Sequence, residues 1–159
     1  ATKSSKLNIS KLENTKKIAD IFAKNIFKGN VILFYGEIGV GKTTFIKFLV
    51  NSLEKIDKKN ISEITSPTFS LMNQYKLNKF DIHHYDLYRL KSEKDILSLN
   101  IFEDISDKIV LIEWPEILGE HKPRNTIDIN FEYGENFNSR YLTISAYEKL
   151  KIFDEFKSL

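Results

Sequence analysis

The chain has 159 residues, 42% of them hydrophobic, which is enough for one ordinary hydrophobic core. Its 24 basic and 22 acidic side chains nearly cancel to a formal net charge of +2, so it lacks the strongly basic balance typical of direct nucleic-acid binding. It contains no cysteine, which excludes disulfides, thiolate metal sites and a cysteine nucleophile.

An amphipathic helix is the first predicted element. Ser10 and Glu13 have the spacing of a capping box, and apolar residues then recur with the helical period until about residues 28–29. Residues 31–35 form a continuous β-favouring apolar run, which is typical of a strand covered on both faces. From Lys42 the apolar residues return to helical spacing, so a glycine-rich loop joins a buried strand to a helix.

A pair of strands and a short helix are predicted next. Residues 69–76 and 80–87 are aromatic-rich segments separated by a short polar turn, which indicates two neighbouring strands. Ser92 stands three residues before an acidic side chain, and this capping spacing predicts a short helix through about Leu99.

The last third of the chain predicts three further strands and a helix. Residues 109–112 form a buried strand ended by Glu113. Residues 127–133 and 142–146 alternate between apolar and polar, which predicts a half-exposed antiparallel hairpin. Apolar residues at Leu150, Phe153 and Phe156 predict a terminal helix.

These elements predict an α/β fold with a mixed sheet covered by helices. No apolar run is long enough to span a membrane, and no signal-peptide core is recognisable. We therefore expect a single cytoplasmic domain over residues 1–159 that does not contact a membrane.

The loop between the first strand and second helix matches the Walker A pattern of a phosphate-binding loop. Its residues are Gly36, Glu37, Ile38, Gly39, Val40, Gly41, Lys42 and Thr43, followed by Thr44. Glycines allow several backbone amides to turn toward phosphate oxygens, and the helix that follows adds its positive dipole end. Lys42 can reach the β- and γ-phosphates, and the Thr43 hydroxyl can bind Mg²⁺. A glycine turn that carries a lysine by chance is disfavoured by the strand before it and the helix after it.

Two acids compete for the role of the second acid that a P-loop ATPase requires. Glu113 follows a buried strand, at the sheet edge where ligands of open α/β sheets bind, although it could also be a solvated acid at a strand end. Asp86 lies among tyrosines and an arginine, and the alternative for it is a surface salt bridge. His84 beside Asp86 gives only a weak case for a transition metal. We interpret the match of residues 78–81 to the guanine-recognition pattern N-K-x-D as coincidence.

Four segments together resemble the TsaE (YjeE) family. They are residues 36–44, residues 66–69 with Tyr75, residues 84–90 and residues 112–116. The resemblance implies a P-loop NTPase-like fold with a parallel core and flanking antiparallel strands. It also implies a bacterial ATPase that uses ATP and Mg²⁺ and is required for threonylcarbamoyladenosine in tRNA. Family members work with TsaB and TsaD, where ATP hydrolysis drives or resets the complex, so tRNA is met only through that complex.

The resemblance also implies residue roles. Lys42 corresponds to the phosphate lysine, Thr43 and Glu113 to the magnesium ligands, and Asp86 to the acid that hydrolysis requires. Ser66 and Thr68 belong to a switch-type segment beside the nucleotide.

Three features of this resemblance stay open. Arg140, in the carboxyl-terminal hairpin, could approach the nucleotide. Trp114 either walls the site, faces a partner or packs in the core. The adenine pocket is expected from the amino-terminal segment and has no named residues.

Two alternatives to an ATPase remain from the sequence. One is a nucleotide-gated binding module that hydrolyses negligibly, and phosphate release distinguishes it from an ATPase. The other is a small-molecule kinase, which generally needs more cationic groups around the transferred phosphate than the three arginines of this chain supply.

Overall fold

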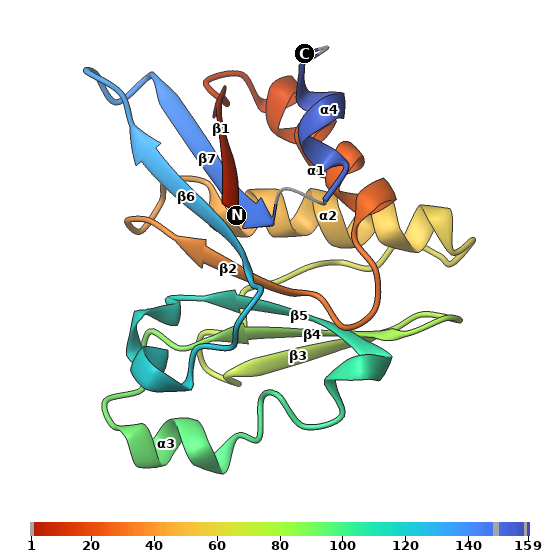
Figure 1. Ribbon diagram of the computed structural model, residues 1–159, viewed down its shortest axis with the longest axis vertical. Helices are drawn as coiled ribbons and strands as arrows, with labels where there is room; N and C mark the ends of the chain where they lie inside the picture. Colours follow the sequence, from red (N-terminus) through yellow and green to blue (C-terminus); the bar gives the residue numbers. More distant parts are fainter. Residues whose placement is uncertain (1, 148–149, 158) are drawn as a thin grey trace.

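The computed structural model describes residues 2–147, 150–157 and 159, and in this part of the chain seven strands form one sheet of order β1-β7-β6-β2-β5-β4-β3 (Figure 1). The strands are β1 (Thr2–Asn8), β2 (Val31–Tyr35), β3 (Met72–Lys76), β4 (Asp81–Asp86), β5 (Lys108–Glu113), β6 (Ile127–Tyr133) and β7 (Arg140–Tyr147). The helices are α1 (Leu12–Asn25), α2 (Lys42–Ile56), α3 (Glu93–Ser98) and α4 (Ile152–Phe156), with 3-10 turns η1 (Ile105–Asp107) and η2 (Pro115–His121). None of these helices combines the length and the apolarity that crossing a bilayer requires.

The sheet has a parallel core with antiparallel strands on both sides. Strands β6, β2, β5 and β4 run parallel, β3 pairs antiparallel with β4, and β7 pairs antiparallel with both β6 and β1. The predicted mixed α/β sheet is therefore confirmed, and the carboxyl ends of the four parallel strands meet at one edge.

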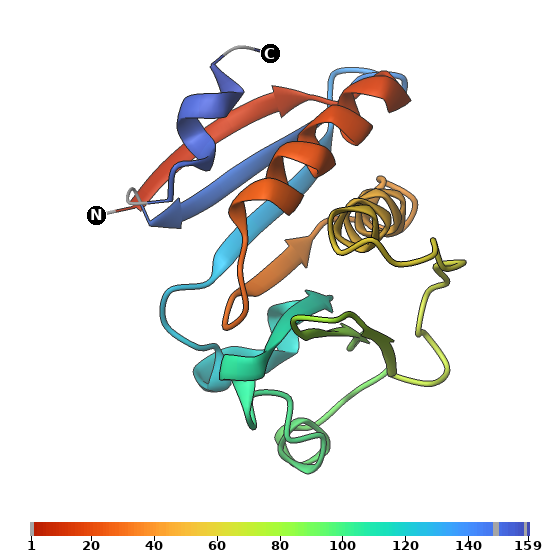
Figure 2. The ribbon, with the colours of Figure 1, turned by 90° about the vertical axis from the view of Figure 1, so that its right-hand side faces the viewer.

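Helices cover the two faces of the sheet unequally. Apolar residues of α1, α2 and α4 share one core with the strands, and Figure 2 shows α1 and α2 side by side along that face. Residues of α3 and η2 form a second core on the opposite face. In β2, Ile32 and Phe34 belong to the first core while Val31 and Leu33 belong to the second. This double burial explains the continuous apolar run of β2.

Several predicted boundaries are wrong at the amino-terminal end. The sequence pattern does not predict β1, because this exposed edge strand is mostly polar and alternates only weakly between apolar and polar residues. The N-cap of α1 is Lys11 and not Ser10, whose hydroxyl instead accepts a hydrogen bond from the Arg140 amide at 3.0 Å. The helix ends at Asn25, earlier than predicted, because Ile26 already has extended backbone.

Other elements follow the prediction more closely. Ser92 caps α3 by accepting from the Asp95 amide at 3.3 Å, as its spacing predicted. The hairpin β6–β7 is confirmed. β3 begins later than predicted, because residues before Met72 form a turn in which the Leu71 amide bonds to the Pro67 carbonyl. β4 is one residue shorter than predicted at each end. The terminal helix begins at Ile152, so Leu150 precedes it.

Candidate functional site

The Walker A segment forms the turn between β2 and α2, at the carboxyl edge of the parallel core. Gly36 has φ +142°, and a Cβ there would lie 2.8 Å from the Phe131 carbonyl oxygen, so no side chain fits. Gly41 is the N-cap of α2 with φ +119°, and the first turn of that helix carries no acidic side chain. The loop thus presents the amino-terminal end of a 15-residue helix without a built-in anion, as a phosphate site requires.

The other loop residues divide into a tip and a buried base. Glu37, Ile38 and Gly39 are exposed at the tip, whereas Val40 is buried. Thr44, in the first turn of α2, is exposed.

Lys42 is enclosed by the loop and an aromatic ring. Its side chain is buried, and its ammonium donates to the Gly36 carbonyl oxygen and lies 3.6 Å from the centre of the Trp114 ring. Burial lowers its pKa, and three nearby carboxylates oppose that shift: Glu113, Glu116 and Asp86. The lysine amino group is therefore enclosed beside the loop, close to three carboxylates.

Trp114 walls the lysine side of the site. Its backbone is left-handed, with φ 56° and ψ 53°, and its ring also packs 4.9 Å from the Tyr88 ring. Of the three roles left open by the sequence, the structure therefore supports a wall around Lys42, because the ring is only half-buried and faces the ammonium.

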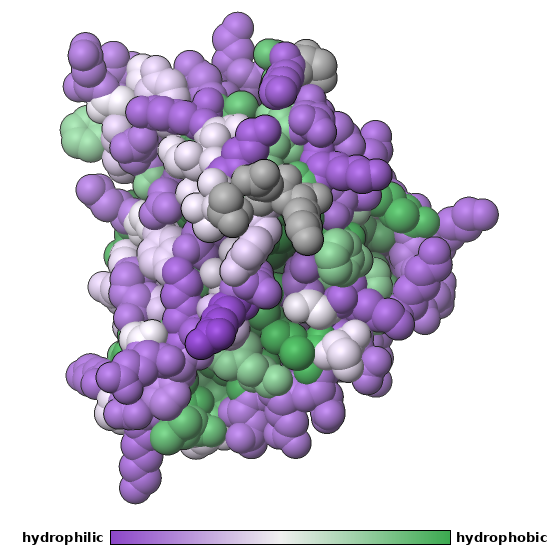
Figure 3. All heavy atoms as spheres, viewed as in Figure 1, coloured by the Kyte–Doolittle hydropathy of each residue, from purple (hydrophilic) through white to green (hydrophobic). Residues whose placement is uncertain are grey.

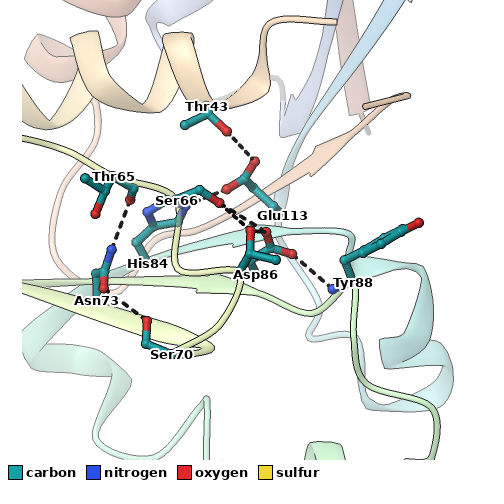
Figure 4. Close-up of polar contacts among 10 residues, drawn as sticks. Thr43, Thr65, Ser66, Ser70, Asn73, His84, Asp86, Tyr88 and Glu113 are labelled. Carbon is teal, nitrogen blue, oxygen red and sulfur yellow. Dashed lines mark hydrogen bonds and ion pairs between the residues drawn. The ribbon is translucent and has the colours of Figure 1, made fainter. Parts of the chain in front are cut away.

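Thr43 and Glu113 face each other across the sheet edge (Figure 4). The Thr43 hydroxyl donates to Glu113 Oε1 at 3.1 Å, and Glu113 is only 2% exposed. Glu113 is therefore not a solvated acid at a strand end. The pair offers two adjacent oxygens, the ligand type that Mg²⁺ prefers.

His84 is the second partner of Glu113, and the sequence did not identify this contact. The His84 ring is fully buried, and its Nε2 lies 2.8 Å from Glu113 Oε2. A carboxylate oxygen can only accept, so the imidazole donates from Nε2. His84 Nδ1 has no partner among the described residues, and leaving a buried polar atom unpaired costs about 1–3 kcal/mol.

Asp86 is buried beside Glu113 and is not part of a surface salt bridge. Its Oδ2 accepts from the hydroxyls of Ser66 at 3.3 Å and Thr68 at 3.1 Å, and its Oδ1 accepts from the Tyr88 amide at 3.0 Å. The structure thus brings the predicted switch-type segment onto the predicted second acid (Figure 4).

Arg140 borders a cavity that continues from the loop. The cavity has a volume of about 290 Å³ and is lined by Ile9, Ser10, Leu12, Thr15, Val40, Gly41, Thr44, Phe137, Asn138 and Arg140. The Arg140 guanidinium lies 5.5 Å from the centre of the Tyr133 ring. Three segments distant in sequence build this cavity, so the sequence alone could not name its residues.

Two other features lie away from this edge. Asn78 of the N-K-x-D match lies in the β3–β4 turn, at the opposite end of β4 from Asp86, and bonds to Asp57. A larger hollow of about 990 Å³ is bordered by the first residues of β2 and β6, Val31 and Ile127. Figure 3 shows apolar side chains in the middle of the face that is also seen in Figure 1. No residue of the Walker A segment borders the hollow.

Comparisons with known proteins concern the family and the fold of the chain. Residues 9–142 match the family model described as threonylcarbamoyl adenosine biosynthesis protein TsaE. The chain is 36% identical to the tRNA threonylcarbamoyladenosine biosynthesis protein TsaE of Rickettsia conorii over 137 residues, covering 86% of this chain and 75% of that protein. It is 34% identical to the protein of the same name from Nostoc over 148 residues, covering 89% and 86%. The crystal structure of Bacillus subtilis YdiB has the same fold, with a TM-score of 0.73 and 24% identity over 99% of this chain and 96% of that one.

Proposed function

The chain belongs to the TsaE family and to the biosynthesis of threonylcarbamoyladenosine in tRNA, and within that role we propose that it is a magnesium-dependent ATPase. The observation that carries the proposal is the meeting of four groups at one sheet edge. These are the ammonium of Lys42, the hydroxyl of Thr43 and the buried carboxylates of Glu113 and Asp86.

The triphosphate would be bound by the loop and Lys42. The amides from Gly36 to Thr44 supply neutral donors, and the buried ammonium supplies a positive charge that water screens poorly. The cavity beside Thr44 and Arg140 has room for the nucleoside part of the ligand. We propose that the base lies beside the amino-terminal segment 9–15, where the family resemblance expects it.

The oxygens of Thr43 and Glu113 fit magnesium by their chemistry. Both are hard oxygen donors on neighbouring elements, and Mg²⁺ commonly takes only one or two protein ligands beside water and phosphate oxygens. Bound there, magnesium would neutralise negative charge on the phosphates. The described residues contain no cluster of three or more His, Cys, Asp or Glu side chains that could hold a metal by themselves.

Asp86 is the residue we assign to water. Its carboxylate is oriented by one backbone amide and two hydroxyls, so it can accept a hydrogen bond from a water molecule without reorganising. In hydrolysis the water oxygen bonds to the γ-phosphorus while a water proton passes to the Asp86 carboxylate, the bond to the β-γ bridging oxygen breaks, and ADP and phosphate leave. Beside this carboxylate, Trp114 packs against both Lys42 and Tyr88.

The partners we propose come from the family. TsaB and TsaD would be the proteins whose complex is driven or reset by ATP hydrolysis, tRNA would be met only through them, and the reaction would take place in the cytoplasm. The near balance of 24 basic and 22 acidic side chains is consistent with an indirect contact to tRNA.

Phosphate release from Mg-ATP, measured with and without TsaB and TsaD, tests the ATPase proposal. Turnover in either condition supports it. Nucleotide binding without turnover in both conditions would replace it with a nucleotide-gated binding module. Transfer of phosphate to a metabolite, seen as a phosphorylated product in place of free phosphate, would replace it with a kinase.

A further inference from the structure

The buried carboxylate of Glu113 is held from both sides. Oε1 accepts from Thr43, the residue proposed to share the metal, and Oε2 lies 2.8 Å from His84 Nε2. Figure 4 shows the histidine approaching Glu113 from the side away from Thr43. Each oxygen therefore has its own partner, and the rotation of the carboxylate is restricted.

The strand register explains how His84 reaches this position. β4 and β5 are parallel neighbours, with Asp86 opposite Glu113 and His84 opposite Leu111. Side chains two residues apart on a strand point to the same face, so His84 and Glu113 project on the side covered by α2. His84 thus supports Glu113 from within the core, one step below the sheet edge.

Space-filling alone does not account for an imidazole at this position. The ring is fully buried, and Nδ1 has no partner among the described residues. Burying this unpaired nitrogen costs free energy, and an apolar side chain of similar size would avoid that cost. The contact that His84 adds is the Nε2 donor to Glu113.

We infer that His84 is a positioning residue that fixes the Glu113 carboxylate for magnesium, an inference that rests on the proposed function. Glu113 Oε1 can exchange the Thr43 hydroxyl for a cation while Oε2 keeps its contact with His84. Histidine–carboxylate contacts of this kind around a metal orient the ligand and are worth about 10- to 100-fold in metal affinity. His84 touches neither substrate nor metal in this assignment.

The test measures nucleotide binding and not turnover. Calorimetry with a non-hydrolysable ATP analogue, over a series of free Mg²⁺ concentrations and in EDTA, gives the Mg²⁺ half-saturation of each variant. For His84→Leu we expect this value to rise about 10-fold or more, with unchanged analogue affinity in EDTA. His84→Gln, whose amide nitrogen can replace Nε2, should recover most of the loss.

A matched control lies next to His84 on the same strand. His83 is only partly buried and projects to the opposite face of β4, so His83→Leu should keep the wild-type Mg²⁺ half-saturation. The inference is overturned if His84→Leu also keeps that value or if His84→Gln is as weak as His84→Leu. It is also overturned if these variants lose as much analogue affinity in EDTA as they do in Mg²⁺. A wild-type protein that binds no nucleotide would instead overturn the proposed function.

A measurement on the unmodified protein decides the matter even if His84→Leu fails to fold. Long-range ¹H–¹⁵N correlation spectra report which ring nitrogen carries the proton. The chain has only three histidines, and the His84→Gln spectrum identifies the signal of His84. A proton on Nε2 supports the inference, and a neutral ring protonated only on Nδ1 overturns it because such a ring cannot donate to Glu113.

Discussion

Glu113 and Asp86 stand opposite each other on neighbouring strands, yet different parts of the molecule hold them. The Glu113 side consists of Thr43, His84 and Glu113, which lie on α2 and on two core strands. The Asp86 side consists of Ser66, Thr68, Asp86 and Tyr88, three of which lie outside the helices and strands.

This difference separates a rigid part of the site from an adjustable one. Burial of His84 and Glu113 favours fixed geometry, as magnesium coordination requires. On the Asp86 side, Ser66 is exposed and Phe69 of the same segment is 86% exposed, so these two residues can rearrange at small cost in packing. We therefore expect binding to depend on the first side and turnover on the second.

Replacing the carboxylate of the Asp86 side should produce the largest effect. Asp86→Asn keeps the shape but removes the oxygen that can take a proton from water, and we expect turnover to fall about 10²- to 10⁴-fold. Analogue affinity measured by calorimetry should stay at the wild-type value. Asp81→Asn, at the other end of the same strand, is the control and should leave both quantities unchanged. Equal loss of binding and turnover in Asp86→Asn would show that the two sides are not separable.

Lys42→Ala should affect binding as well as turnover, because the Lys42 amino group lies near both Glu113 and Asp86. Removing a buried charge that contacts phosphate should weaken analogue binding by about 2–5 kcal/mol. Lys47→Ala on the exposed face of the same helix changes the net charge equally and should bind as wild type. An unchanged dissociation constant for Lys42→Ala would contradict the assigned phosphate site.

Removing magnesium tests the Glu113 side alone. Because coupling between two bound ligands is reciprocal, EDTA should lower analogue affinity by the same factor as the nucleotide raises magnesium affinity, about 5- to 150-fold. The response to EDTA should disappear in Glu113→Gln and persist in Asp86→Asn. Glu116→Gln, which alters an exposed acid just beyond Trp114, should respond as wild type. A normal response in Glu113→Gln would remove Glu113 from the metal site.

The same contrast explains what could be predicted from the sequence. The Glu113 side rests on periodic elements, so the Walker A spacing and the buried run 109–112 were sufficient to place Thr43 and Glu113 at one edge. The contact of His84 depends on the register between two strands, which no local pattern encodes. The cavity beside Arg140 and the edge strand β1 likewise depend on long-range pairing, as in the bond from the Arg140 amide to Ser10.

Thr68→Ala should produce the smallest effect and sharpen the comparison most. It removes one of two hydroxyls from Asp86 Oδ2 while the Tyr88 amide still orients the carboxylate. A hydrogen bond of this kind contributes about 0.5–1.5 kcal/mol, so turnover should fall roughly 2- to 12-fold with analogue affinity unchanged. Ser70→Ala is the matched control, because Ser70 lies in the same segment but bonds to Asn73. Wild-type turnover in Thr68→Ala would mean that the segment does not act through Asp86, whereas an altered response to EDTA would mean that it also supports the Glu113 side.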